Sequence, residues 1–198
     1  MKHFLLSVLL LLSFFDANAQ RKGSIVRIDG TISVACINDY MDYCHHHQIE
    51  DNWCWAACIQ MVLDYYGISV TQSMIVEQTY GDLYDITANK EDIIDAIDGW
   101  NICDQTLEAR YEQYKNPQTL IDAVARGKPL IIGLDEDDVS IGHAYVLTHI
   151  FFTKDYNNNM TPTRVVVLNP ANSEDLEESL DWSEFYERIN TIITITSY

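Results

Sequence analysis

The stretch that decides the fold is QIEDNWCWAACIQMVLDYYG, residues 48–67. Its alanines and long apolar side chains recur every three to four residues, which is the spacing of a buried helix face. We therefore predict a helix over residues 53–66. Asp51 or Asn52 is placed to cap its first turn, and Gly67 is placed to end it. This is the strongest helix that the sequence indicates.

The chain around this helix divides into a helical part and a later part rich in strands. Further helices, indicated by capping residues and terminal glycines, cover residues 72–79, 90–98, 117–126 and 182–188. Strands, indicated by apolar runs between turn residues, cover a hairpin at 24–36 that turns at Gly30, and residues 129–134, 143–154, 164–169 and 190–197. Because most of the helices precede the antiparallel strands, we predict an α+β fold with an N-terminal helical part packed against a C-terminal sheet or barrel.

The first residues are typical of an export signal. The apolar run FLLSVLLLLSFF (residues 4–15) is followed by the small-residue pattern ANA (17–19). The run is shorter than the roughly 20 residues that span a bilayer. We predict a signal peptide over residues 1–19, a strand and loop segment over 20–47, and the main part of the same domain over 48–198. The mature protein should be secreted or periplasmic.

The formal net charge of −18 limits the possible partners. Nucleic-acid phosphates and anionic lipid surfaces would be repelled by such a chain. A solvated acidic surface is the simplest explanation, and a preference for basic substrates is the alternative. We expect no nucleic-acid partner, no membrane insertion after signal removal, and a monomer.

The five cysteines are an odd number in a chain that carries an export signal. Disulfides persist in the oxidising compartments outside the cytosol, and an odd count leaves one thiol over. If Cys54 is that thiol, two disulfides can form in three alternative pairings, which the sequence leaves open. The four remaining cysteines are Cys36, Cys44, Cys58 and Cys103.

Cys54 is the candidate nucleophile. It falls in the first turn of the predicted helix, where unpaired N–H groups and the helix dipole stabilise a thiolate. Cys58 lies one turn further along, where this effect has faded. We therefore expect Cys58 to be a core thiol or a disulfide partner.

A thiolate hydrolase also needs a base, a group that orients the base, and an oxyanion hole. His143 begins a predicted strand directly after a loop and is the candidate base; His149, on the same strand face, is its rival. Asn169 ends the next strand and could accept a hydrogen bond from the imidazole. The N–H of Cys54 and the side-chain amide of Gln48 could form the oxyanion hole.

The run His45-His46-His47 beside Cys44 is the alternative site. Cysteine and histidine are common metal ligands, so the run resembles a metal site. However, neighbouring loop residues seldom all reach one ion, and known zinc sites use ligands that are spaced along the chain. We expect no metal and no cofactor.

In this order, the residues resemble the papain-like cysteine peptidases. The resemblance rests on Gln48, five residues, then Cys54-Trp55-Ala56, on Gly142-His143-Ala144, and on Asn169-Pro170. NWCWAAC followed by MVLDYYG is most similar to the compact bacterial branch, which includes secreted effector proteases and bacteriocin-leader-processing enzymes. The resemblance implies the papain-like cysteine proteinase fold, with residues 48–198 as the catalytic domain.

It also implies a role for each candidate. Cys54 attacks, His143 shuttles the proton, Asn169 orients it, and Gln48 binds the oxyanion. The expected substrate is a peptide or protein. Three alternatives stay open: amide chemistry on the same fold (deamidase, transamidase or cell-wall amidase), a binding module with a dead site, and a metal protein using the histidine run.

Overall fold

The computed structural model describes residues 23–98, 100–102, 105–136, 139–171 and 176–197. The predicted signal peptide lies outside these ranges, so residues 1–19 stay a prediction. Along the chain the elements are β1 (Ser24–Arg27), β2 (Ile32–Cys36), the 3₁₀-helix η2 (Asp39–Tyr43), α1 (Cys54–Tyr65), α2 (Gln72–Tyr80), α3 (Lys90–Asp98), β3 (Asn101–Ile102), β4 (Gln105–Tyr111), α4 (Pro117–Ala125), β5 (Leu130–Glu136), β6 (Val139–Lys154), β7 (Met160–Leu168), β8 (Glu177–Asp181), α5 (Trp182–Arg188) and β9 (Ile189–Ser197). Among the described helices, none has the length and apolarity to cross a membrane.

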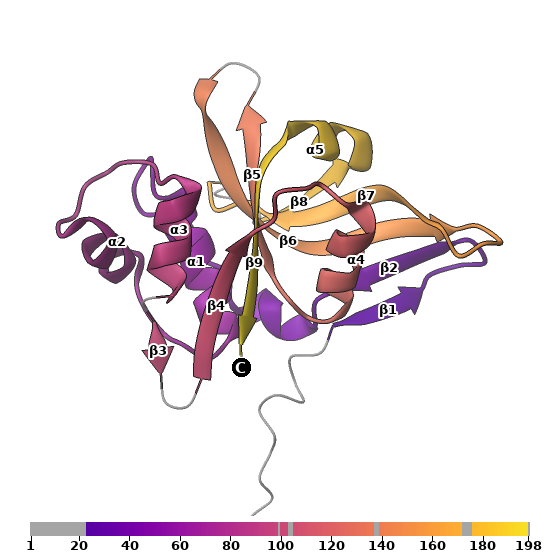
Figure 1. Ribbon diagram of the computed structural model, residues 1–198, viewed down its shortest axis with the longest axis horizontal. Helices are drawn as coiled ribbons and strands as arrows, with labels where there is room; N and C mark the ends of the chain where they lie inside the picture. The colour runs from indigo at the N-terminus through magenta and orange to yellow at the C-terminus, as the bar shows by residue number, and fades with distance from the viewer. Residues whose placement is uncertain (1–22, 99, 103–104, 137–138, 172–175, 198) are drawn as a thin grey trace, which may run out of the picture.

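Strand β6 organises the antiparallel sheet (Figure 1). Along one edge it pairs first with β5 and then with β2, and along the other edge it pairs with β7. Register shifts between Leu147 and His149, and between Phe151 and Phe152, bend the β6–β7 pair. On the far side of β5 the order continues through β9, β4 and β3, while β8 pairs with β7. The sheet therefore curls around the long central strand.

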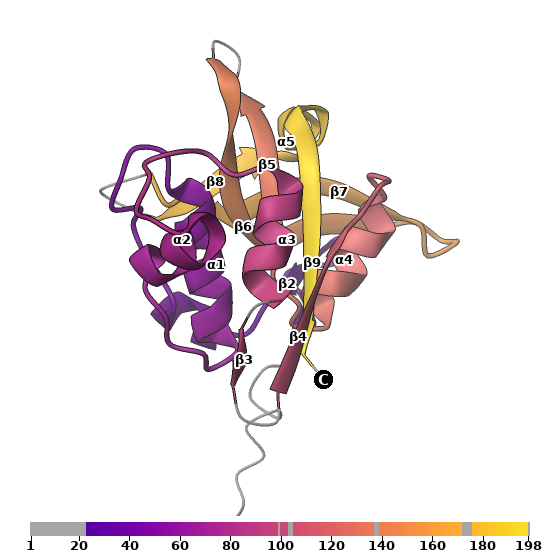
Figure 2. The ribbon, with the colours of Figure 1, turned by 60° about the vertical axis from the view of Figure 1, so that its left-hand side comes forward.

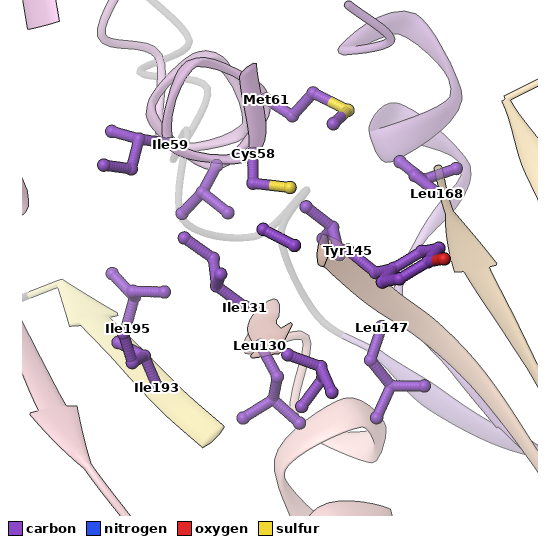
Figure 3. Packing of buried hydrophobic residues seen from close by; sticks show 14 of the residues in the cluster. Cys58, Ile59, Met61, Leu130, Ile131, Tyr145, Leu147, Leu168, Ile193 and Ile195 are labelled. Carbon is purple, nitrogen blue, oxygen red and sulfur yellow. The ribbon is translucent and has the colours of Figure 1, made fainter. Parts of the chain in front are cut away.

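Helix α1 is the core helix that its sequence predicts. Every residue in it is buried except Gln60 and Asp64. Figure 3 shows Cys58, Ile59 and Met61 of α1 near apolar side chains of the strands, among them Ile131. Even the two polar residues have partners, since Gln72 binds the Gln60 amide and His46 binds the Asp64 carboxylate.

Helices α1, α2 and α3 gather at one side of the sheet, and α4 lies apart from them (Figures 1 and 2). Helix α1 packs against β6 and against both of the other helices. Helix α4 packs against β2, β6 and β7, and α5 packs against β5, β7 and β8. The helical part and the sheet thus share one continuous core, and the predicted α+β fold is confirmed.

The structure adds elements to those that the sequence predicts. Strands β3, β4 and β8 and the short helix η2 were not predicted. The sequence of β8, EESLD, has a single buried residue, Leu180. Its strand form comes from pairing with β7, where Glu178 lies opposite Val167. A strand that forms through pairing with a distant segment shows little alternation of apolar and polar residues in its own sequence, so it is hard to predict.

Candidate active site

Cys54 is the first residue of α1 and is 7% exposed. The N-cap residue, Trp53, makes no side-chain capping hydrogen bond with any described residue, so the predicted cap at Asp51 or Asn52 is wrong. Asn52 is held elsewhere, because its N–H donates to Asp85 Oδ1 at 2.8 Å. The first turn of α1, which Cys54 begins, therefore receives no capping hydrogen bond from the side chain of its N-cap residue.

Two tryptophans tie the start of α1 to the segment that joins α2 to α3. Trp53 donates its indole Nε1–H to the carbonyl of Tyr84 at 2.8 Å, and Trp55 donates its own to the carbonyl of Ile86 at 3.1 Å. Trp55 is also packed edge-on against Tyr80, with ring centroids 5.8 Å apart. These indoles hold the segment beside Cys54, a role that sequence reasoning missed.

His143 and Asn169 form the pair that the sequence predicts. Nε2 of His143 lies 2.9 Å from Oδ1 of Asn169. The amide orientation of Asn169 is set by its neighbours: Nδ2 donates to Glu178 Oε2 at 2.8 Å, and Oδ1 accepts from the N–H of Ala171 at 3.0 Å. Because Oδ1 accepts, Nε2 of the imidazole must carry the donated proton. In the neutral ring, Nδ1 is then the basic nitrogen.

A cavity of about 450 Å³ brings the two halves of the site together. Cys54 lines it from the start of α1, and His143 lines it from β6. Thr87, Ala88 and Asn89, which follow the segment held by the tryptophans, form part of its wall. Cys54 and His143 therefore face one solvent-accessible space, and Asn169 lies beside His143.

The rival residues are placed away from this chemistry. Cys58 is fully buried, and burial together with the nearby Cys54 raises the pKa of its thiol well above the ordinary value. His149 is not among the residues that line the cavity. Its Nδ1 lies 3.0 Å from Thr148 Oγ1, and burial lowers the pKa of its ring. Neither is suited to act as a nucleophile or base at the Cys54 cavity.

Gln48 lies in the loop that precedes α1, where it contacts that loop and the segment after Asn169. Its backbone N–H donates to the carbonyl of Pro170, next to Asn169. Its side-chain Nε2 donates to the carbonyls of Glu50 at 3.0 Å and Asp51 at 2.8 Å. Gln48 lines a second cavity, of about 380 Å³, rather than the one that contains Cys54.

The expected pair of disulfides is not formed. No disulfide joins any two of the four cysteines that the structure describes. Two disulfides among the four remaining cysteines would need one bridge without Cys103, which lies outside the described residues. The geometry explains the outcome: Cys36 Sγ lies 3.2 Å from Ser24 Oγ on the hairpin, Cys44 Sγ donates to the Tyr40 carbonyl, and Cys58 is buried in α1.

Comparison with known proteins agrees with the fold. The model of the Peptidase_C39 like family matches residues 39–193. Among solved structures, the peptidase domain of Streptococcus ComA, a bifunctional ABC transporter involved in a quorum-sensing pathway, aligns with a TM-score of 0.55. The two chains are 16% identical, and the alignment covers 77% of this chain and 95% of that one. A search of curated proteins finds no match.

The fold and the site define a papain-like cysteine peptidase. The family match extends over most of the chain, from η2 into the last strand, and the chain belongs to the Peptidase_C39 like family.

Proposed function

We propose that this protein is an exported cysteine peptidase in which Cys54, His143 and Asn169 form the catalytic triad. The observation that carries the proposal is the hydrogen bond from His143 to Asn169, together with the cavity that His143 shares with Cys54. The apolar run of residues 4–15 and the small residues after it support export.

The proposed reaction is acyl transfer through a thioester. His143 accepts the thiol proton of Cys54 at Nδ1, and the thiolate attacks the carbonyl carbon of the scissile peptide bond. The tetrahedral intermediate collapses as the imidazolium gives its proton to the leaving amine. Water, deprotonated by the same imidazole, then cleaves the thioester and releases the carboxylic acid. Asn169 keeps the ring in the required tautomer throughout.

The oxyanion is stabilised by backbone N–H groups at the start of α1 and by Gln48. The position of Cys54 as the first residue of α1 supports the first donor. For the second, one Nε2 hydrogen of Gln48 must leave the carbonyl of Glu50 or Asp51 when the oxyanion forms. Loss of an oxyanion donor costs about 10²–10³ in kcat. Gln48→Ala should therefore lower kcat far more than it changes KM; unchanged kcat with reduced thermal stability would assign Gln48 to loop structure alone.

Matched variants test the triad. Cys54→Ala should abolish cleavage of a peptide library, followed by mass spectrometry, while Cys58→Ala, one turn along the same helix, should retain activity in the folded protein. His143→Ala should lose activity in the same way, and His149→Ala should keep it. Rate losses of about 10⁴ or more are expected for the first member of each pair. Two results would contradict the proposal. One is loss of activity with Cys58→Ala but not with Cys54→Ala, and the other is deamidation of the substrate peptides, seen as a gain in mass, without cleavage of their backbone.

Export is tested separately. The full chain, expressed with a C-terminal tag in a bacterium, should appear outside the cytoplasm with Gln20 as its first residue. Recovery of the intact chain from the cytoplasm would remove this part of the proposal and leave the triad untouched.

A further inference from the structure

We propose that Asp42, His45 and Glu177 form a zinc-binding site on the protein surface, separate from the peptidase cavity. One ring nitrogen of His45 and one carboxylate oxygen each from Asp42 and Glu177 lie within 4.8 Å of one another. Asp42 belongs to η2, His45 follows it by three residues, and Glu177 begins β8. The proposal does not depend on the peptidase function.

The state of His45 points to a missing partner. Its Nε2 atom is buried, yet it has no hydrogen-bond partner among the residues that the structure describes. A buried ring nitrogen without a partner is costly, and coordination to a cation is one way to satisfy it. The neighbouring histidines are placed differently, because His46 pairs with Asp64 at 2.5 Å and His47 is exposed.

The surrounding charge favours a cation. Asp42 and Glu177 place two carboxylates within reach of each other in a chain whose net charge is already −18. Asp39 adds a third carboxylate to the neighbourhood, since it acts electrostatically on His149 together with Asp42 and Glu177. A divalent ion would offset this repulsion, and the two carboxylates are exposed, so the ion can enter from solvent.

The donor set selects zinc among common divalent ions. Carboxylate oxygens alone suit Ca²⁺ and Mg²⁺, whereas an imidazole favours Zn²⁺ and related transition metals. Zinc lies about 2.0–2.2 Å from nitrogen and oxygen ligands, so two ligands of one tetrahedral ion are about 3.4 Å apart. The three ligand atoms lie within 4.8 Å of one another, so small rotations of the side chains would bring them to that distance. A water molecule can supply the fourth ligand.

The site would join two segments that flank the catalytic machinery. His45 lies in the loop that leads through Gln48 to Cys54. Glu177 precedes Glu178, whose carboxylate holds Asn169. A bound ion would therefore fasten the loop before α1 to the strand behind the base, as a structural clamp.

The experiment measures zinc itself, in a Cys54→Ala background so that the active-site thiol does not bind the metal. After dialysis against micromolar Zn²⁺, atomic emission should find one zinc per chain. His45→Ala and the isosteric Glu177→Gln should each weaken binding at least tenfold, and His47→Ala, the matched control in the same run, should leave it unchanged. Glu177 is exposed, so Glu177→Gln should fold normally, as circular dichroism will show.

Three outcomes would overturn the proposal. The first is no zinc retained by the background protein. The second is equal loss of zinc with His47→Ala and His45→Ala. The third is a thiolate-to-metal charge-transfer band when Co²⁺ is used as the probe, because it would place the ion on a cysteine.

Discussion

The carboxylate of Glu178 accepts a hydrogen bond from Nδ2 of Asn169 at 2.8 Å. Glu178 reaches this position because β8 pairs with β7, with Glu178 opposite Val167. The bond fixes which end of the asparagine amide faces His143, and therefore which ring nitrogen of His143 is basic. A residue that does not line the cavity thus sets which ring nitrogen of His143 carries the proton.

Removing this carboxylate should weaken catalysis without removing the triad. Glu178→Ala is expected to lower kcat about tenfold, the equivalent of one hydrogen bond worth about 1.4 kcal/mol. Glu178→Gln can still accept through its Oε1 and should retain most of the activity. The measurement is kcat and KM on one peptide substrate. The control is Glu187→Ala, which removes a carboxylate on α5 instead. Equal activity of Glu178→Ala and wild type would show that Asn169 needs no such support.

The two cysteines of α1 should differ in reactivity. Cys54 lines the cavity, whereas burial and the nearby Cys54 raise the pKa of the Cys58 thiol. In the native protein, iodoacetamide should therefore modify Cys54 and leave Cys58 unmodified up to about pH 9, since only the thiolate reacts. Tandem mass spectrometry of the peptide that contains both residues distinguishes them. Modification of both in the native state, rather than only after denaturation, would contradict the assignment.

Stability should depend on pH through His149. Burial lowers the pKa of its ring below the ordinary value of about 6.5, although Glu177, Asp42 and Asp39 act in the opposite direction. The unfolded chain then binds the proton more readily than the folded one. The contribution of the neutral ring is therefore present above about pH 6.5 and is lost as the pH falls through the lower folded value.

The urea midpoint at pH 7.5 and at pH 5 measures this effect, with EDTA present to remove metal. The wild type should lose more stability than His149→Gln between the two values. The same loss in both proteins would assign the acid sensitivity to other groups.

The tryptophan contacts should matter for substrate binding as well as stability. Trp55→Phe removes the indole N–H that binds the Ile86 carbonyl and leaves a space in the core. We expect a loss of about 2 kcal/mol in the free energy of unfolding. We also expect a higher KM, because Thr87 and Ala88, which line the cavity, come directly after Ile86 in the chain. Trp182→Phe, on α5, is the control. A stability loss with KM unchanged would show that the wall does not contact substrate.

Gly142 should not tolerate a side chain. A Cβ atom at this position would lie 2.8 Å from Asn190 Nδ2 and 2.9 Å from the backbone carbonyl of Leu134. Gly142→Ala should therefore cost about 1–3 kcal/mol and displace the adjacent His143, which lowers kcat. Gly30→Ala, where a Cβ meets nothing within 4 Å, is the matched control and should be close to neutral. Thermal unfolding and kcat together decide the outcome.

The sequence predicted the parts of the fold that carry a local pattern. Helix α1 was predicted because its apolar spacing is strong, and β6 because its apolar run is long. The pairing of β8 with β7 depends on partners distant in sequence, so β8 was missed. For the same reason the sequence did not indicate that His45 lies near Glu177, and from the histidine run alone we expected no metal.

The candidate site was also predicted only in part. The pairing of His143 with Asn169 was expected, and it is observed. The cap of α1 was not predicted correctly, because short polar loops offer several carbonyls and amides at similar distances. Side-chain choices among them are decided by packing, such as the contacts of Asn52 with Asp85, rather than by order along the chain.

Strand β9 lies between β5 and β4, although it is the last strand described in the chain. Its insertion completes the ladder that holds β5, and β5 in turn supports the part of β6 that carries His143. Strand β5 therefore gains its second neighbour only after β9 has been synthesised, and such long-range pairing forms slowly. A chain cut before β9 should consequently leave the strand that carries His143 without full support and show no peptidase activity.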